Sequence, residues 1–207
     1  MKRTITVPGT GRVTVEPDVA SVRLGVNIQR ESAGQAREDA ANTMNAIIEA
    51  ITGQGVERRD VRTAMVTLGP VTDYSEGGPR IVGYQLLNSV EVTLRNLDVA
   101  GALIDATLGA GASTLDSLEF RLEDPSAAEE TARTLAIENA HSRATTLATA
   151  AGSKLGKVVS VTESEHVGGG GPIPYARAMA MEAKADTPVE AGTQEIAVAV
   201  TVTFALA

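Results

Sequence analysis

The sequence predicts an α+β protein in which helices pack on a largely antiparallel sheet. Apolar residues alternate with polar or small ones over residues 20–29 and 196–206, which is typical of strands with one buried face. Over residues 36–51 and 132–148, apolar or small residues recur at helical spacing instead. Because Gly- and Pro-containing turns separate these segments, strands and helices are expected to follow one another along the whole chain.

The first strand and the first helix of this series have clear boundaries. A strand is predicted from Val19 to about Arg30. Ser32 then stands where a helix N-cap belongs, and Gly53 and Gly55 are expected to end the helix. The residues that this helix would bury are Ala36, Ala40, Met44, Ile47, Ile48 and Ile51.

The middle of the chain predicts two more strands and a shorter helix. The strands lie near residues 61–71 and 84–94, on either side of a turn at Gly77-Gly78-Pro79. Asp98 is expected to cap the helix, which would cover residues 98–111 and end at its glycines.

The last part of the chain predicts a strand over residues 114–123 and then a long helix. This helix begins at Asp124-Pro125, because a capping carboxylate followed by proline is typical of a helix start. Alanines at every fourth position would let it lie close to a neighbouring element: Ala132, Ala136, Ala140, Ala144 and Ala148. Strands over residues 155–163 and 196–206 close the series.

The order of these elements allows two descriptions of a single α+β domain over residues 1–207. Residues 19–123 spell β-α-β-β-α-β, the ferredoxin-like order, followed by α-β-β. Alternatively, residues 19–95 and 114–206 each spell β-α-β-β, as two duplicated halves linked by the helix at 98–111. Both descriptions place helices on a largely antiparallel sheet.

The segment Gly9-Thr10-Gly11 invites comparison with a phosphate-binding loop. Such a loop follows a strand and opens a helix, whereas here a strand follows. We therefore predict a turn or bulge between two strands at this position.

Composition excludes several classes of function. A net charge of -8 argues against a general nucleic-acid binder, and the absence of cysteine excludes disulfides and thiolate metal sites. No apolar run approaches the roughly 18 residues of a membrane helix. The residues after Met1-Lys2-Arg3 are too short and polar a run for the apolar core of a leader. The chain is thus expected to be cytoplasmic if Met1 is the native start, and exported if a leader was removed.

A set of short motifs follows the predicted elements in a fixed order: Gly9-Thr10-Gly11, Pro17-Asp18-Val19-Ala20, Val61-Arg62-Thr63, Gly83-Tyr84-Gln85 with Asn88, Phe120, Leu155-Gly156 and Gly192. No single motif is specific. As an ordered set that spans essentially the whole chain, they resemble the SIMPL domain family.

This resemblance implies a bacterial cell-envelope protein, usually exported by a leader peptide and without an established enzymatic activity. Members include a periplasmic immunogenic antigen and proteins linked to oxidative-stress defence, and at least one assembles into a large ring-like or channel-like oligomer. The resemblance supplies no catalytic residues.

The sequence contains no grouping typical of a catalytic or metal site, so we predict no enzyme, no catalytic residues, no cofactor and no metal. A hydrolase would need a Ser or Thr hydroxyl close to His141 or His166. In an extended chain Glu163 and Glu165 share one face while His166 takes the other, which does not favour a joint metal site.

Asn88 is the one polar residue in an apolar row that also contains Tyr84. A buried amide must be hydrogen-bonded. Asn88 therefore either closes a structural hydrogen-bond network or lines a pocket together with Tyr84.

The segment from about residue 166 to 192 is longer than an ordinary connection and carries Ile173, Tyr175, Met179 and Met181. It can be read as an interaction arm or as a disordered excursion. A third hypothesis is sacrificial oxidation of the two methionines.

Taken together, these observations predict a non-enzymatic protein that works by self-association as a homo-oligomer. The family resemblance implies in addition a place in the periplasm or cell envelope and a relation to oxidative-stress tolerance. The docking surface would be the small-residue outer face of the last strand, formed by Ala197, Ala199, Thr201, Thr203 and Ala205. The alternative is a small-molecule-binding protein with a pocket near Tyr84 and Asn88.

Overall fold

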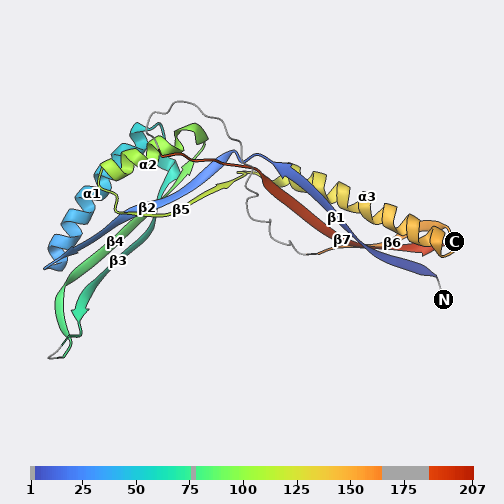
Figure 1. The fold of residues 1–207 in the computed structure, drawn as a ribbon, viewed down its shortest axis with the longest axis horizontal. Helices are drawn as coiled ribbons and strands as arrows, with labels where there is room; N and C mark the ends of the chain where they lie inside the picture. The colour runs from blue at the N-terminus through green and yellow to red at the C-terminus, as the bar shows by residue number, and fades with distance from the viewer. Residues whose placement is uncertain (1–2, 76–77, 165–186) are drawn as a thin grey trace. The chain divides into compact units, whose positions relative to one another are not determined.

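A computed structural model describes residues 3–75, 78–164 and 187–207 of the chain. The expected α+β class is confirmed, since helices pack on antiparallel sheets (Figure 1). The elements are β1 (Thr4–Val15), β2 (Val19–Arg30), α1 (Ala33–Gly53), β3 (Val61–Asp73), β4 (Arg80–Leu94), α2 (Ala100–Gly109), β5 (Thr114–Arg121), α3 (Ser126–Ala150), β6 (Leu155–Glu163) and β7 (Gln194–Leu206), with short 3-10 turns at Arg58–Asp60 and Leu97–Val99.

The chain divides into two compact units, each with its own sheet and core. Unit 1 contains β1, α3, β6 and β7, and its strands lie in the order β1-β7-β6. Unit 2 contains residues 18–121 together with the return segment at 187–191, and its strands lie in the order β3-β4-β2-β5. The description of residues 19–95 and 114–206 as duplicated halves stays a prediction.

Unit 1 is built around the alanine row of α3. These five alanines are at most 1% exposed, and four of them pack with Val7 of β1 and the inward side chains of β7 in one apolar cluster. The inward residues of β7 are Val198, Val200, Val202 and Phe204. Because a methyl group is the largest side chain along this face of α3, the helix lies close to the strands.

The expected turn at Gly9-Thr10-Gly11 is wrong, because these residues lie inside the continuous strand β1, which pairs with β7 along its whole length. A Cβ atom at Gly9 would overlap the carbonyl oxygen of Ala136, and one at Gly11 would overlap that of Ala132. The glycines are therefore needed for the close approach of a helix to a strand, and not for chain reversal.

Unit 2 has its core between α1 and the face of the sheet formed by the even-numbered residues of β2 and β4. The predicted helix is confirmed: Ser32 is its N-cap, and its Oγ accepts a hydrogen bond from the Gln35 N–H at 3.3 Å. Residues Ala36, Ala40, Met44, Ile47 and Ile51 are buried against the sheet.

The start of α2 differs from the prediction, whereas that of α3 lies one residue after the predicted first helical position at Pro125 and does have the expected carboxylate of Asp124 beside it. Asp98 does not cap α2; instead the Asn96 side chain accepts the Asp98 N–H at 3.2 Å and caps the 3-10 turn that leads into the helix. At α3, the Asp124 carboxylate accepts the N–H of Ser126, the first helical residue, at 3.0 Å. Asp98 lies inside the 3-10 turn before α2, a feature that is frequent at helix termini, and the cap therefore lies two residues earlier than predicted.

Candidate interaction surfaces

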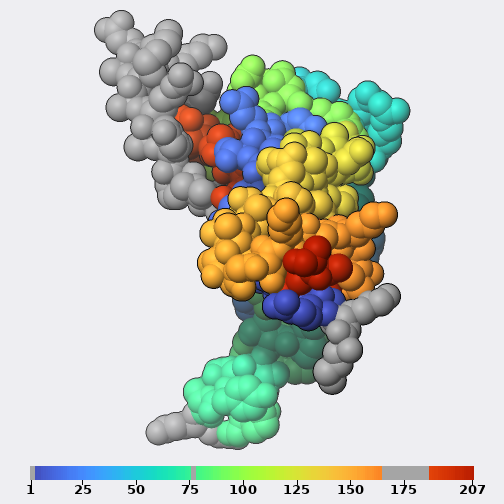
Figure 2. Space-filling view, turned by 90° about the vertical axis from the view of Figure 1, so that its right-hand side faces the viewer, coloured from blue at the N-terminus to red at the C-terminus, as the bar shows by residue number. Residues whose placement is uncertain are grey.

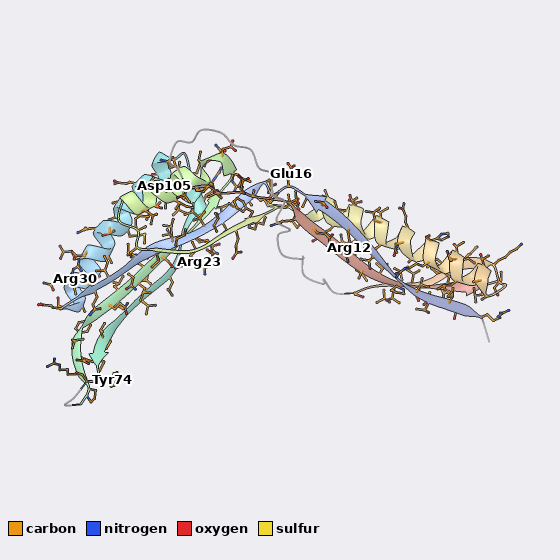
Figure 3. The ribbon with its side chains drawn as sticks, viewed as in Figure 1. Arg12, Glu16, Arg23, Arg30, Tyr74 and Asp105 are labelled. Atoms are coloured by element: carbon orange, nitrogen blue, oxygen red, sulfur yellow. The ribbon has the colours of Figure 1, made fainter. Side chains whose placement is uncertain are left out.

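The face of the β1-β7-β6 sheet opposite α3 carries small and hydroxyl-bearing side chains. On β1 they are Thr4, Thr6, Pro8, Thr10, Arg12 and Thr14, and on β7 they are Glu195, Ala197, Ala199, Thr201, Thr203 and Ala205. The predicted row on the last strand thus shares one face. Thr6 and Thr203 lie opposite each other with their hydroxyl oxygens 2.9 Å apart. The charged residues among these are Arg12, labelled in Figure 3, and Glu195, which form an ion pair at 2.7 Å.

The outer edge of β1 is covered at its middle by side chains of α3. The Asn139 Oδ1 accepts the Thr10 N–H at 3.2 Å, and Arg143 Nη1 donates to the Pro8 carbonyl oxygen at 3.1 Å. Pro8 itself has no N–H to offer. Covering an edge in this way prevents another strand from pairing there.

The opposite edge of the same sheet is formed by β6, which is protected less well. α3 lies over β1 and β7, and three valines of β6 remain about half exposed: Val158 at 52%, Val159 at 58% and Val161 at 50%. An edge strand with apolar side chains favours pairing with another chain. The sequence contains a signal for this exposure, because the run Val158-Val159-Ser160-Val161 places valines on both faces of the strand.

Apolar side chains are also exposed on both faces of the hairpin of β3 and β4. Its exposed side chains are Met65, Val66, Leu68, Ile81 and Val82, with Tyr74 80% exposed at the end of β3. Figure 2 shows atoms of this hairpin end at the surface, and Figure 3 marks Tyr74 there. The paired residues Thr72↔Ile81 and Asp73↔Arg80 extend beyond Arg30, the last residue of β2, so this end of the hairpin has two strands only.

The face of the second sheet that points away from α1 is polar. Its centre is Glu91 of β4, whose carboxylate pairs with Arg23 and Arg62, each at 2.9 Å, and accepts a hydrogen bond from Ser21 at 3.3 Å. The hydrogen bonds from Arg62 and Arg23 lower the pKa of Glu91 from 4.5 to about 2. Glu91 is therefore ionised in any ordinary condition, and its role is to hold three neighbouring strands together.

Unit 1 also contains a shallow groove with a volume of about 390 Å³ between β1 and α3. It is lined by Val7, Pro8, Ser142, Arg143, Thr146 and Leu147. Arg143 is the charged residue of this groove that could orient a ligand. Its guanidinium already donates a hydrogen bond to the Pro8 carbonyl oxygen and so helps to hold α3 on β1.

Asn88 was expected either to close a structural hydrogen-bond network or to line a pocket with Tyr84, and this stays a prediction. The Asn88 Oδ1 is buried and has no hydrogen-bond partner among the described residues, and neither has the Oγ of the neighbouring Ser89. Asn88 stands between Val26 of β2 and Val66 of β3, and Tyr84 between Arg30 and Pro70. The groove of unit 1 is not lined by either residue.

Of the histidines and carboxylates considered as reactive groups, the structure describes His141 and Glu163. His141 is exposed on α3, with its ring edge-on to Phe204 at a centroid distance of 5.8 Å. Glu163 accepts hydrogen bonds from Arg133 Nε at 3.1 and 3.3 Å. His166 and Glu165 lie outside the described residues, as do Ile173, Tyr175, Met179 and Met181.

Within ranges 3–75, 78–164 and 187–207, no three His, Asp or Glu side chains are grouped closely enough to hold a metal ion. None of the helices in this described part combines the length and hydropathy that a membrane span requires.

Comparison with known proteins gives a consistent picture. The model of the SIMPL family, described as "Protein of unknown function (DUF541)", matches residues 5–204. "Uncharacterized protein YggE" of Escherichia coli K12 is 33% identical over 179 residues, which cover 86% of this chain and 72% of that protein. The "26 kDa periplasmic immunogenic protein" of Brucella melitensis is 32% identical over 208 residues, which cover 97% and 83%. YggE of Edwardsiella ictaluri is 30% identical over 192 residues, covering 92% and 80%.

Proposed function

Since this chain belongs to the SIMPL (DUF541) family, whose activity is unknown and one of whose members is called periplasmic, we propose that it is a self-associating, non-catalytic protein of the bacterial cell envelope. The observation that carries this proposal is the β6 edge of unit 1, whose valines the described residues leave about half exposed. Edge strand β6 presents three half-exposed valines, while the opposite edge at β1 is covered at its middle by Asn139 and Arg143.

The two edges of this sheet differ in how accessible their backbone groups and apolar side chains are to a second copy. A sheet with one edge covered and the other presenting apolar side chains pairs through the second edge, because backbone groups and apolar side chains are both accessible there. The flat small-residue face next to that edge allows a second copy to approach closely. The link with oxidative-stress tolerance is supported by the resemblance to the family.

The experiment is light scattering coupled to gel filtration at tens of micromolar, where the mass of one copy is 21.4 kDa. We expect the wild-type chain to elute as an oligomer, and the double variant Val159→Lys/Val161→Lys to shift toward the monomer. Leu147→Lys is the matched control, because Leu147 on α3 is 51% exposed but is not on the edge. A wild-type chain that is strictly monomeric contradicts the proposal.

The alternative function, binding of a small molecule near Tyr84 and Asn88, is supported by the buried Asn88 Oδ1 that has no partner in the described chain. A ligand with a hydrogen-bond donor could satisfy this oxygen. If the chain binds such a ligand, one or more envelope-type metabolites are expected to raise the melting temperature of the wild type and to leave that of Asn88→Leu unchanged.

A further inference from the structure

The groove between β1 and α3 in unit 1 has the size of a small-molecule site. Its volume of about 390 Å³ lies within the range of roughly 300–1,000 Å³ that is usual for ligand pockets. The strand supplies Val7, which is 2% exposed, and Pro8, while the helix supplies Leu147 and the methylene groups of Arg143. The lining is therefore mainly apolar, and the apolar part of a ligand placed there is removed from water.

Arg143 is the charged residue of this groove, and most of its donors are not used by the protein. A guanidinium carries N–H donors on Nε, Nη1 and Nη2. Arg143 donates from Nη1 to the Pro8 carbonyl oxygen at 3.1 Å, and in the part of the chain that the structure describes neither a carboxylate nor a second acceptor meets it. On the same helix Arg133 does form ion pairs, with Glu129 at 3.0 Å and with Glu163 at 3.1 Å. Arg143 thus keeps a positive charge that a bound anion can use.

The hydroxyl groups next to Arg143 in the lining add hydrogen-bonding capacity. Ser142 and Thr146 lie one helical turn apart. The Thr146 hydroxyl donates to the Ser142 carbonyl oxygen at 3.1 Å, whereas the Ser142 hydroxyl has no partner among the described residues. None of the lining residues is acidic, so no side chain of the lining repels an anion. The groove therefore combines one cation and a hydroxyl donor with an apolar lining.

We propose that this groove binds an amphipathic monocarboxylate, whose carboxylate meets the Arg143 guanidinium and whose short aliphatic body lies along Val7, Pro8 and Leu147. One carboxylate matches one guanidinium in charge, and the planar donors on Nε and Nη2 suit its two oxygens. A nucleotide fits less well, because it carries more charge than one arginine neutralises and the lining offers no aromatic side chain for stacking. The site lies within unit 1 and does not require that copies of the chain associate.

The probe is octanoate, and saturation-transfer NMR measures its binding to the wild-type chain. This method observes the ligand, so it works whether or not the chain is oligomeric. We expect a dissociation constant on the order of 1 mM, as for a ligand of about ten non-hydrogen atoms of ordinary ligand efficiency. Acetate lacks the aliphatic body and 1-octanol lacks the charge, so each is expected to bind at least about tenfold more weakly than octanoate.

Arg143→Gln removes the charge and keeps an amide that can donate to the Pro8 carbonyl oxygen. We expect this variant to bind octanoate at least about tenfold more weakly than the wild type. Arg143→Lys keeps the charge without the planar donors and is expected to fall between the two. Leu135→Gln is the matched control and is expected to bind like the wild type, because Leu135 lies on the same helix and is 39% exposed but does not line the groove.

Hydrogen exchange of the β1 amides shows that each variant is folded. A wild-type chain that gives no saturation transfer at about 5 mM octanoate would show that the groove is not a site. Equal affinity of the wild type and folded Arg143→Gln, or of octanoate and 1-octanol, would show that only apolar surface is involved and would overturn the proposal as well. None of these results bears on self-association, which is tested separately through the β6 valines.

Discussion

Gly9 of β1 faces the carbonyl oxygen of Ala136 in α3, and there is no room for a Cβ atom between them. This relationship fixes the distance at which the helix lies over the sheet of unit 1. Ala140 also crowds this position, with its Cβ 2.8 Å and its N 2.9 Å from the place that a Cβ at Gly9 would take.

Gly9→Ala is therefore expected to force α3 away from β1 and to lower the free energy of unfolding by about 2 kcal/mol or more, in the range of overpacked cores. Chemical denaturation measures this change. Gly69→Ala on β3 is the matched control, because a Cβ at that strand glycine meets nothing within 4 Å. The explanation fails if the two variants lose the same stability.

Glu91 predicts a dependence of stability on pH. Its pKa is about 2 in the folded chain against an ordinary 4.5, because Arg62 and Arg23 stabilise the carboxylate. A lowered carboxyl pKa contributes stability that is complete above about pH 4.5 and is lost as the pH falls toward 2. The size is about 1 kcal/mol, since Arg62 is 70% exposed and water screens the pair.

Urea unfolding between pH 2 and pH 6 tests this assignment with Glu91→Gln. The variant is expected to have a lower free energy of unfolding than the wild type at pH 6, and the difference should shrink on acidification through this window. A difference that stays constant from pH 6 to pH 2 would show that the ion pairs do not contribute.

At Ser89 we expect a substitution to raise the free energy of unfolding instead of lowering it. Its side chain is 4% exposed, and its Oγ has no hydrogen-bond partner in the part of the chain that the structure describes. Removing an unsatisfied buried hydroxyl relieves a desolvation cost, so Ser89→Ala is expected to raise the free energy of unfolding by about 1 kcal/mol. A clear loss of stability in thermal unfolding would mean that the hydroxyl has a partner, for example a bound water.

Methionine oxidation can be examined residue by residue. Met65 is 46% exposed on β3, whereas Met44 is 5% exposed in the core of unit 2. Because access to the sulfur governs oxidation, Met65 is expected to form its sulfoxide at least about ten times faster than Met44 in dilute peroxide. Peptide mass spectrometry follows both residues in one sample. Equal rates in the folded chain would contradict the burial of Met44.

The sequence predicts the elements of both units except β1, and the reason lies in particular residues. Helix α1 was predictable from its apolar row and Ser32, and β7 from strict alternation. Strand β1 was not, because Pro8, Gly9 and Gly11 are typical of turns, and only the backbone of α3 above them explains their presence in a strand. A pattern of neighbouring residues cannot show a contact between residues more than 120 positions apart.

The interaction surfaces were predictable in part for a similar reason. The outer face of β7 follows from alternation alone. That β6 would be an edge strand depends on the pairing order of the sheet. That residues 187–191 would lie on α2 depends on the contact of Thr187 with Asp105. Both features depend on tertiary structure, which the spacing of residues along the chain does not show.

The proposed function requires that copies of this chain associate through the β6 edge of unit 1. Sedimentation velocity of the wild type and of Val159→Lys/Val161→Lys, across protein concentrations from one to one hundred micromolar, tests it most directly. We expect the wild type to sediment faster as concentration rises and the double variant to keep the sedimentation coefficient of a single 21.4 kDa chain. A wild type whose coefficient stays at the single-chain value throughout would contradict the claim, and so would a folded double variant that assembles like the wild type.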